Sequence, residues 1–218
     1  MKNRFFAVLV PALSLLLVSC NQDEIREYDI FRGDETHMYA VDLGLSVKWA
    51  CCNIGAEIPE EYGSYYAWGD PEEKDSCAWS VYKWHDNNIN EITKYNDEDG
   101  KRVLDPSDDI AQIMWGEDWR MPTQAEIQEL MECCEWEWTS VNGVYGYEVS
   151  GNGNSIFLPA AGYRSGTSLD TAAGCYGTFW SSTPYNGSNA KYFYFYSSRH
   201  YESVCNRSYG RTVRPVLE

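Results

Sequence analysis

The sequence has little positive charge: 17 Lys and Arg stand against 33 Asp and Glu, giving a formal net charge of −16 at pH 7. Phosphate backbones are usually bound by basic surfaces, so this balance argues against a nucleic-acid partner. Histidine is also scarce, and no C-x-x-C pair occurs, so a structural zinc site is not expected. The G-x-S-x-G and H-E-x-x-H motifs of two hydrolase classes are absent as well. These absences favour a protein that is not an enzyme and has no cofactor.

The apolar run at the start of the chain is too short to cross a bilayer. It extends from Phe5 to Val18, 14 residues, after two basic residues, whereas a membrane-spanning helix needs about 20. This pattern is typical of a signal peptide, which is excluded from the fold. The run ends in Leu17-Val18-Ser19-Cys20, which resembles the bacterial lipobox. We therefore expect lipid attachment at Cys20; the alternative is an ordinary secretory signal with an incidental cysteine.

The segment after the signal peptide predicts a surface location. Asp23 and Glu24 follow Cys20 closely and resemble an acidic export signal that sends some lipoproteins to the outer face of the outer membrane. We expect an exported protein that contacts the membrane through its lipid anchor only and faces the cell exterior. The chain is divided into a signal peptide (1–19), a lipidated N-terminus and tether (20–36) and one folded domain (37–218).

Two helices are predicted in the middle of the chain. Thr123 and Glu126 form a capping box, with Thr123 as the N-cap and Glu126 three residues later. Apolar residues then follow at the spacing of one helical face, at Ile127, Leu130, Met131 and Cys134. A second, shorter helix is expected from Asp108 to Met114.

Short strands are predicted after these helices. Trp136 and Trp138 alternate with polar residues, which is typical of a strand. Asn142-Gly143 between two strand-like runs is a strong signal for a two-residue hairpin, with the return strand at 144–149. Another short strand is expected at 155–159. Two short helices among several short antiparallel strands predict a compact α+β domain.

The cysteines of the folded domain leave their pairing open. Seven cysteines follow Cys20, an odd number, so one thiol is expected to be free or paired between chains. A Cys52–Cys134 disulfide is one pairing that the sequence allows. Adjacent cysteines at 51–52 and 133–134 prevent a unique assignment.

The acidic stretch at 95–109 resembles a calcium loop only superficially. With Gly100 at loop position 6, Tyr95 and Pro106 stand where an EF-hand requires carboxylates. A solvated loop is therefore favoured. The alternative is an irregular Ca²⁺ site formed by Asp97, Glu98, Asp99, Asp105, Asp108 and Asp109.

Four ordered motifs carry a resemblance to a known family. They are DLGLSVKWA at 42–50, WRMPTQAE at 119–126, IFLPAAGYR at 156–164, and WSS at 180–182 with VRPV at 213–216. The second resembles a signature shared by formylglycine-generating-enzyme-like and related C-type-lectin-like domains. Together the motifs resemble the Fibrobacter succinogenes major paralogous domain, found in surface lipoproteins of gut anaerobes. The resemblance spans about residues 40–218 and implies a C-type-lectin-like fold with no settled activity.

The resemblance also raises an enzyme alternative. In formylglycine-generating enzymes, two cysteines near the C-terminus carry the redox chemistry. Here the last 40 residues contain only Cys205, and Cys175 lies 30 residues earlier. The matching pair is absent, so a formylglycine-generating-like oxidoreductase is the least favoured alternative.

The C-terminal part of the chain is rich in tyrosine, with six between positions 185 and 209. Across 192–196 Tyr alternates with Phe, and successive side chains of a strand point to opposite faces. We expect Phe193 and Phe195 to face the core and the tyrosines to form a binding face, because Tyr offers a large contact area with few torsions to freeze. The alternative is a strand buried on both sides. The predicted ligand-binding residues are Tyr185, Asn186, Tyr192, Tyr194, Tyr196, Ser198, Arg199, His200, Tyr201, Ser203, Asn206, Ser208 and Tyr209.

The position of this stretch also resembles the variable region of proteins diversified by retroelements. Adenine-directed mutagenesis of AAC or AAT codons yields Tyr, Ser, Asn, Asp, His, Arg, Cys, Phe or Gly, and most residues of 192–209 belong to that set. The hypothesised variable residues are Tyr192, Tyr194, Tyr196, Ser198, Tyr201, Ser203, Cys205, Asn206, Ser208 and Tyr209.

These observations predict a lipid-anchored surface module that binds a protein or glycan ligand through its C-terminal Tyr/Ser/Asn-rich face. A structural or adhesion lipoprotein without a discrete site is the alternative. Replacing the tyrosines separates the two, because only the first hypothesis expects ligand capture to be lost while the fold survives.

Overall fold

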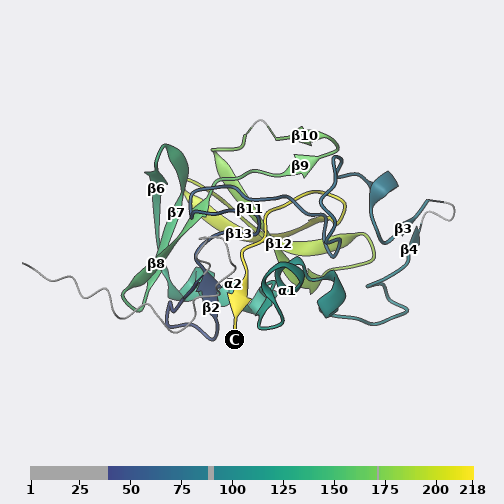
Figure 1. The fold of residues 1–218 in the computed structure, drawn as a ribbon, viewed down its shortest axis with the longest axis horizontal. Helices are drawn as coiled ribbons and strands as arrows, with labels where there is room; N and C mark the ends of the chain where they lie inside the picture. Colours follow the sequence, from purple (N-terminus) through teal and green to yellow (C-terminus); the bar gives the residue numbers. More distant parts are fainter. Residues whose placement is uncertain (1–38, 88–90, 171) are drawn as a thin grey trace, which may run out of the picture.

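The computed structural model describes residues 39–87, 91–170 and 172–218 (Figure 1). The predicted signal peptide, the lipid-attachment residue Cys20 and the tether lie outside the described residues. Among the residues that are described, no helix combines the length and the apolar character needed to cross a membrane.

Strands dominate the described part of the chain, where 39% of the residues lie in strands or bridges and 12% in helices. The predicted α+β, C-type-lectin-like fold class is therefore wrong, and the domain is predominantly β. The two predicted helices exist but are short, α1 (Ile110–Trp115) and α2 (Gln124–Cys133). Their signals are local and therefore visible in the sequence. Several strands have only two residues and pair with distant segments, which local patterns do not reveal.

A four-stranded sheet, which we call the core sheet, joins the two ends of the described chain through very short strands. The sheet has the order β1-β2-β14-β5, with all neighbours antiparallel. Val216 in the C-terminal strand lies opposite Trp49 on one side and Arg120 on the other. The strands are β1 (Ala40–Val41), β2 (Lys48–Ala50), β5 (Trp119–Arg120) and β14 (Val216–Leu217).

A second sheet is a meander of β6 (Glu135–Val141), β7 (Val144–Gly151) and β8 (Asn154–Pro159). Both of its turns are Asn-Gly pairs, at 142–143 and 152–153, and all four residues have positive φ. Two-residue turns of this kind match the twist of the flanking strands. The predicted hairpin at 142–143 is confirmed, and Figure 1 shows the sheet at one end of the molecule.

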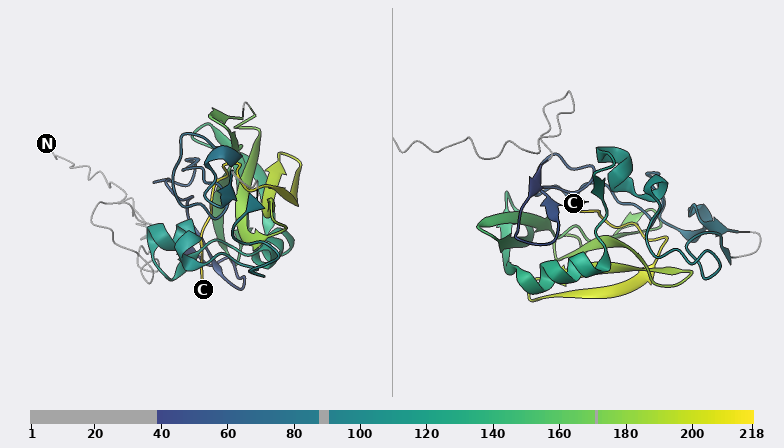
Figure 2. Two further views of the ribbon diagram at one scale, coloured as in Figure 1. Left: turned by 90° about the vertical axis from the view of Figure 1, so that its right-hand side faces the viewer. Right: turned by 90° about the horizontal axis from the view of Figure 1, so that it is seen from below.

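The third sheet contains β11 (Tyr176–Pro184), β12 (Asn189–Tyr196) and β13 (Arg199–Asn206), in that order and antiparallel. Helix α2 contacts β11 and β12, and Figure 2 shows it running alongside this sheet. The remaining elements are two small hairpins and two 3₁₀ turns: β3 (His85–Asp86) with β4 (Glu91–Ile92), β9 (Arg164–Ser165) with β10 (Ser168–Leu169), η1 (Trp79–Val81) and η2 (Pro106–Asp108).

The capping box before α2 is confirmed. The Thr123 hydroxyl accepts from the Glu126 N–H at 3.3 Å, and the Glu126 carboxylate accepts from the Thr123 N–H at 2.7 Å. Arg120 adds two hydrogen bonds to the same carboxylate, at 2.6 and 2.8 Å. The conspicuous W-R-M-P-T-x-x-E motif therefore serves to start a helix and to hold it against β5.

The cysteines do not form the disulfide that the sequence allowed. Cys134 is a free thiol, and a Cβ placed at Gly151 would lie 3.2 Å from its sulfur. The thiols of Cys51 and Cys52 lie 3.6 Å from each other in the core. The structure therefore lacks the Cys52–Cys134 link because Cys134 faces the β7–β8 turn.

Candidate ligand-binding face

Strand β12 separates its phenylalanines from its tyrosines. Phe193 and Phe195 are 2% and 0% exposed, whereas Tyr196 is 45% exposed and Tyr192 and Tyr194 are partly exposed. The ring of Phe193 lies 5.5 Å from that of Trp136 in β6. The predicted division into a core side and a tyrosine side is confirmed.

The register of the sheet brings further rings to the tyrosine side. Tyr176 of β11 lies opposite Tyr196, and Tyr201 of β13 lies opposite Tyr194. Residues directly opposite each other project from the same face of a sheet. We call this surface the tyrosine face and define it by Tyr163, Tyr176, Tyr192, Tyr194, Tyr196, Tyr201 and Tyr209.

The rings of the tyrosine face contact one another in an unbroken series. The centroid distances between neighbours run from 5.1 Å for Tyr194–Tyr201 to 6.3 Å for Tyr163–Tyr176. Aromatic pairs at such distances attract each other, so each ring restricts the rotamers of the next. The face is therefore pre-organised, and little side-chain freedom remains to be lost when a ligand binds.

One carboxylate lies within this aromatic surface. The Tyr176 hydroxyl donates to Asp170 at 2.9 Å, and the Ala172 N–H donates to the same carboxylate at 2.8 Å. The Ala172 N–H is the main cause that holds the pKa of Asp170 below its usual value. Burial, followed by the hydrogen bond to Asp170 and the charge of that carboxylate, raises the pKa of Tyr176. Both effects keep this hydroxyl protonated, so it remains a donor at neutral pH.

The guanidinium group of Arg211 packs against two rings of the tyrosine face. Its guanidinium carbon lies 3.6 Å from the centroid of Tyr192 and 5.3 Å from that of Tyr163. Trp180, which lies opposite Tyr192 and shares its side of the sheet, has its ring 5.2 Å away. Planar guanidinium groups stack well on aromatic rings, so Arg211 joins the tyrosine of β12 to the tyrosine that follows β8.

The structure places other predicted site residues beside or near this face. Arg199 is exposed and donates to the Tyr201 hydroxyl at 3.3 Å. Ser203 lies opposite Tyr192 and shares its side of the sheet. Ser198 is exposed in the β12–β13 turn, and Tyr185 is exposed in the β11–β12 turn.

Four predicted residues do not contribute to the tyrosine face. His200 lies on the opposite side of the sheet, with its ring 4.6 Å from that of Trp136. Asn206 accepts from the N–H and the hydroxyl of Ser208, which is buried, at 2.9 and 2.7 Å. Asn186 accepts from backbone N–H groups within its own turn. These four residues have structural roles, in turns and in the core, that composition alone does not reveal.

Tyr163, Tyr176 and Arg211 were missed by the sequence prediction. Tyr163 belongs to the IFLPAAGYR motif and Tyr176 begins β11, so both lie outside the stretch where tyrosines are dense. Tyr176 reaches the face through the pairing of β11 with β12, and Tyr163 follows Gly162, whose N–H donates to the Tyr176 carbonyl. Applying period 2 to residues 176–180 would have identified Tyr176, whereas nothing in the local sequence marks Tyr163 or Arg211.

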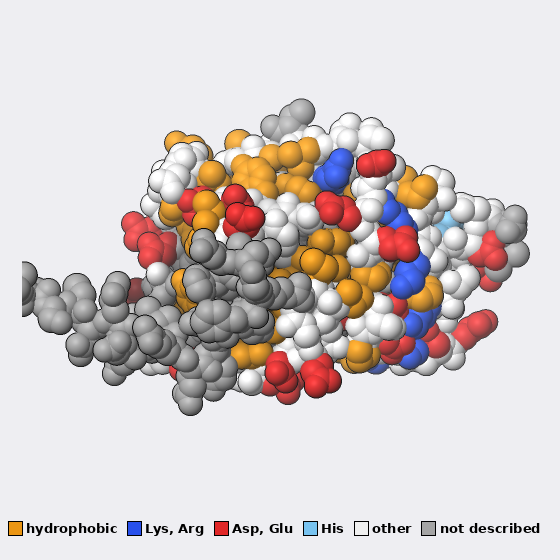
Figure 3. Space-filling model, in the orientation of Figure 1, with side chains coloured by type: hydrophobic (Ala, Val, Ile, Leu, Met, Phe, Trp, Pro, Cys, Tyr) orange, Lys and Arg blue, Asp and Glu red, His pale blue; other side chains and the backbone are white. Residues whose placement is uncertain are grey.

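The acidic loop uses its carboxylates in ion pairs. Asp108 accepts from Lys83 at 2.9 Å and from the Tyr95 hydroxyl at 2.6 Å. Lys94 pairs with Asp105 at 2.6 Å. Figure 3 shows acidic and basic side chains interleaved toward the end of the molecule that carries the β3–β4 hairpin. Over residues 39–87, 91–170 and 172–218, no group of three His, Cys, Asp or Glu is arranged to hold a metal ion.

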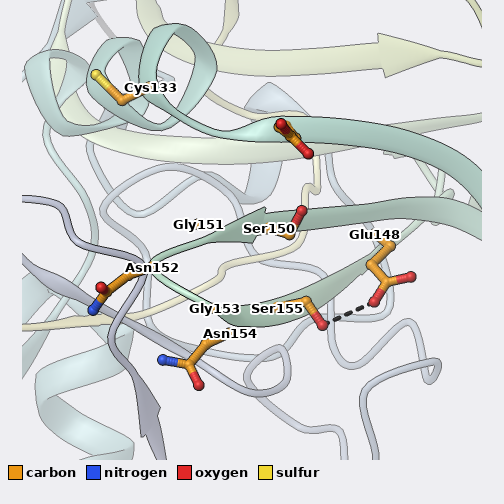
Figure 4. A pocket seen from close by; sticks show the side chains of 9 residues that line it. Cys133, Glu148, Ser150, Gly151, Asn152, Gly153, Asn154 and Ser155 are labelled. Atoms are coloured by element: carbon orange, nitrogen blue, oxygen red, sulfur yellow. Dashed lines mark hydrogen bonds between the residues drawn. The ribbon is translucent and has the colours of Figure 1, made fainter.

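A hollow of about 610 Å³ lies along the β6–β8 sheet (Figure 4). Glu135 and Glu148 line it together with the β7–β8 turn, and the Ser155 hydroxyl donates to Glu148 at 2.8 Å. Glu137 lies directly opposite Glu148, so like charges face each other across the strands. The carboxylates that line the hollow are exposed and solvated, and this surface lacks the pre-organised ring contacts of the tyrosine face.

Comparison with known proteins leaves the activity open. A family model described as a domain of unknown function (DUF8237) matches residues 122–216. This range begins just before α2 and ends in β14, so it includes all three strands of the tyrosine face. No curated protein and no solved structure gives a significant match.

Proposed function

We propose that the protein is a lipid-anchored surface module that captures a protein or glycan ligand on its tyrosine face. Cys20 would carry the lipid, and the acidic tether would hold the domain away from the outer membrane, facing the cell exterior. The membrane is contacted through the lipid only, and no catalytic step is assigned to the chain.

The observation that carries this proposal is the continuous, partly exposed series of seven tyrosine rings on one side of a three-stranded sheet. Tyrosine supplies a large, rigid contact area and a hydroxyl that both donates and accepts hydrogen bonds. Rings that served only the core would be buried like Phe193 and Phe195, whereas Tyr196 keeps 45% of its surface exposed. Exposed aromatic clusters of this kind are typical of binding surfaces.

Glycan and protein arrays probed with the chain from residue 20 onward, carrying Cys20→Ser, test the proposal. We expect a specific ligand whose capture falls at least about tenfold when Tyr194 and Tyr196 are both changed to serine. Tyr145→Ser is the control, because Tyr145 is at least as exposed as Tyr196 but lies on β7. Equal capture of a ligand by the unsubstituted face, by the Tyr194→Ser and Tyr196→Ser double variant and by Tyr145→Ser would contradict the proposal. Retained folding without any ligand on the arrays favours a structural or adhesion role.

The anchoring part of the proposal is tested separately in cells. Labelling with a fatty-acid analogue is expected for the natural chain and lost in Cys20→Ser. External protease on intact cells is expected to remove the domain. Protection of the domain from protease would contradict the outward orientation without affecting the tyrosine face.

Diversification by a retroelement is a further part of the proposal, and the gene tests it. Tyr192, Tyr194, Tyr196, Tyr201 and Ser203 share the outer side of one sheet, which is where variation would alter binding without altering the core. We expect adenine-derived codons ending in pyrimidines at these positions and a near-repeat beside a reverse transcriptase gene. Purine-ending codons would contradict diversification and leave ligand binding unaffected.

A further inference from the structure

Arg211 is a buried cation with a poor set of acceptors. Arg211 is 4% exposed, and its Nε and Nη2 groups donate to the Cys205 sulfur at 3.2 and 3.1 Å. Its Nη1 group is buried and has no hydrogen-bond partner among the residues that the structure describes. No carboxylate of the described residues forms an ion pair with it. A thiol is a weak acceptor, so most of the donors of this guanidinium remain unused.

Two other buried arginines show that this is unusual within the same chain. Arg214 donates to Asn53 at 2.9 Å and to the Phe157 carbonyl at 2.8 Å, among other acceptors. Arg207 donates to the carbonyl of Tyr95 at 2.8 Å and to three further carbonyls. A buried charge is costly unless it is hydrogen-bonded, and the fold meets that requirement at Arg207 and Arg214 but not at Arg211.

The position of Arg211 connects it to the tyrosine face. Tyr192, Tyr163 and Cys205, which contact the guanidinium, are all partly exposed. Trp180, which also contacts the guanidinium, is fully buried. The guanidinium therefore lies directly beneath partly exposed side chains on one side and against buried Trp180 on another.

The geometry of the rings favours a protein over a glycan as the ligand. The ring of Tyr194 is within 28° of parallel to those of Tyr192 and Tyr201, at 5.6 and 5.1 Å. Nearly parallel rings at these centroid distances stack with an offset, so each ring covers part of its neighbour's face. A sugar stacks on an open ring face, whereas the side chains of a protein fill the gaps between ring edges and bond to the hydroxyls. Antibody surfaces rich in tyrosine bind proteins in this manner.

Resting on the proposed function, we infer that Arg211 is the binding site for a carboxylate, supplied by an Asp or Glu side chain of a protein partner. The tyrosines surround that side chain and exclude water, and the guanidinium supplies two parallel N–H donors. A charge-assisted pair inside an aromatic rim is the arrangement expected of an interface hot spot. The protein partner thus supplies a hydrogen-bond acceptor for the unpaired donors of Arg211.

A small carboxylate probe tests the site without knowledge of the partner. The probe is glutamate blocked at both its α-amino and α-carboxyl groups, added to the chain from residue 20 onward carrying Cys20→Ser. The Arg Nε–H resonances are followed by NMR, and that of Arg211 is identified by its loss in Arg211→Lys. We expect a saturable shift with blocked glutamate and binding of blocked glutamine that is weaker by about tenfold or more.

Substitution of Cys205 provides an internal test that does not depend on affinity. Cys205→Asp places a carboxylate beside Arg211, because the sulfur lies 3.1 Å from Nη2. We expect this variant to have a higher Tm than the matched control Cys205→Ser and to lose the response to blocked glutamate. The Cys205→Ser control is expected to keep that response.

Three results would overturn the inference. The first is the absence of a saturable shift at Arg211, and the second is a Cys205→Asp variant less stable than Cys205→Ser. The third is a shift that glucuronate produces at lower concentration than blocked glutamate, which would assign the site to an acidic glycan. Failure of the proposed function looks different. In that case, ligand capture would survive the double substitution of Tyr194 and Tyr196 by serine. The NMR shift of Arg211 with blocked glutamate would still be seen, so the carboxylate site would stand.

Discussion

The two sides of the β11–β13 sheet use aromatic residues for opposite purposes. On the inner side, Phe193 and Phe195 are buried against Phe179 and the rings of the β6–β8 sheet. On the outer side, the tyrosines pack mainly on one another and remain partly exposed. Inner rings therefore contribute to the stability of the fold, whereas outer rings are arranged for contact with a ligand. Residues only one position apart in the sequence are expected to respond differently to substitution.

The largest effect is expected on the inner side, at Phe195→Ala. The side chain is fully buried, so its removal leaves a cavity and should lower the free energy of unfolding by about 3–5 kcal/mol. Urea unfolding followed by tryptophan fluorescence measures the change. Tyr196→Ala is the matched control on the other side, with an expected loss of about 1 kcal/mol or less. Equal losses for both variants would remove the distinction between the two sides.

Gly177→Ala is expected to have the next largest effect. Gly177 lies opposite Phe195, and a Cβ at this position would overlap the Phe195 ring. Overpacking of this kind costs about 1–3 kcal/mol. The cost should shrink in the Phe195→Leu background, where the ring is absent, and a double-mutant cycle by urea unfolding measures the coupling. Additive losses of unfolding free energy would show that contact with the Phe195 ring is not the reason for a glycine at position 177.

A smaller effect on stability, with a large effect on binding, is expected at Tyr201→Ser. Tyr201 loses its stacking on Tyr194 and its hydrogen bond from Arg199, both at a partly exposed position. The free energy of unfolding should fall by less than about 1 kcal/mol, while capture of an array ligand falls severalfold. Thermal unfolding and surface plasmon resonance measure the two quantities. Loss of stability in proportion to loss of capture would assign Tyr201 to the core.

The features that the sequence predicted correctly depend on neighbours close in the chain. The capping box involves residues three positions apart, and the hairpin at 142–143 depends on the positive φ that Asn and Gly adopt. The division of 192–196 into two sides follows from the period of a strand. None of these inferences requires knowledge of distant contacts.

The features that were predicted wrongly or missed depend on pairing across the chain. The class of the fold was wrong because the long strands of the β6–β8 and β11–β13 sheets outweigh the two short helices. The short strands β2, β5 and β14 were missed because contacts between distant segments join them. His200 was assigned to the binding face from its residue type. Because Tyr196 pairs with Arg199, period 2 along β13 places odd-numbered residues outward and His200 inward. The register, rather than the composition, decides which residues share a face.

The smallest effect is expected at His200, a titratable residue on the inner side of the sheet whose ring packs against that of Trp136. Burial lowers its pKa below the ordinary value of 6.5. The folded state therefore binds this proton less readily than the unfolded state, so stability is fully present above pH 6.5 and declines as the pH falls through the folded pKa. His200→Phe keeps the ring and removes the titration. Urea unfolding between pH 7 and pH 5 should show a smaller loss of stability for His200→Phe than for the natural chain. Since all carboxylates are common to both chains, equal losses would mean that His200 is solvated and does not belong to the inner side.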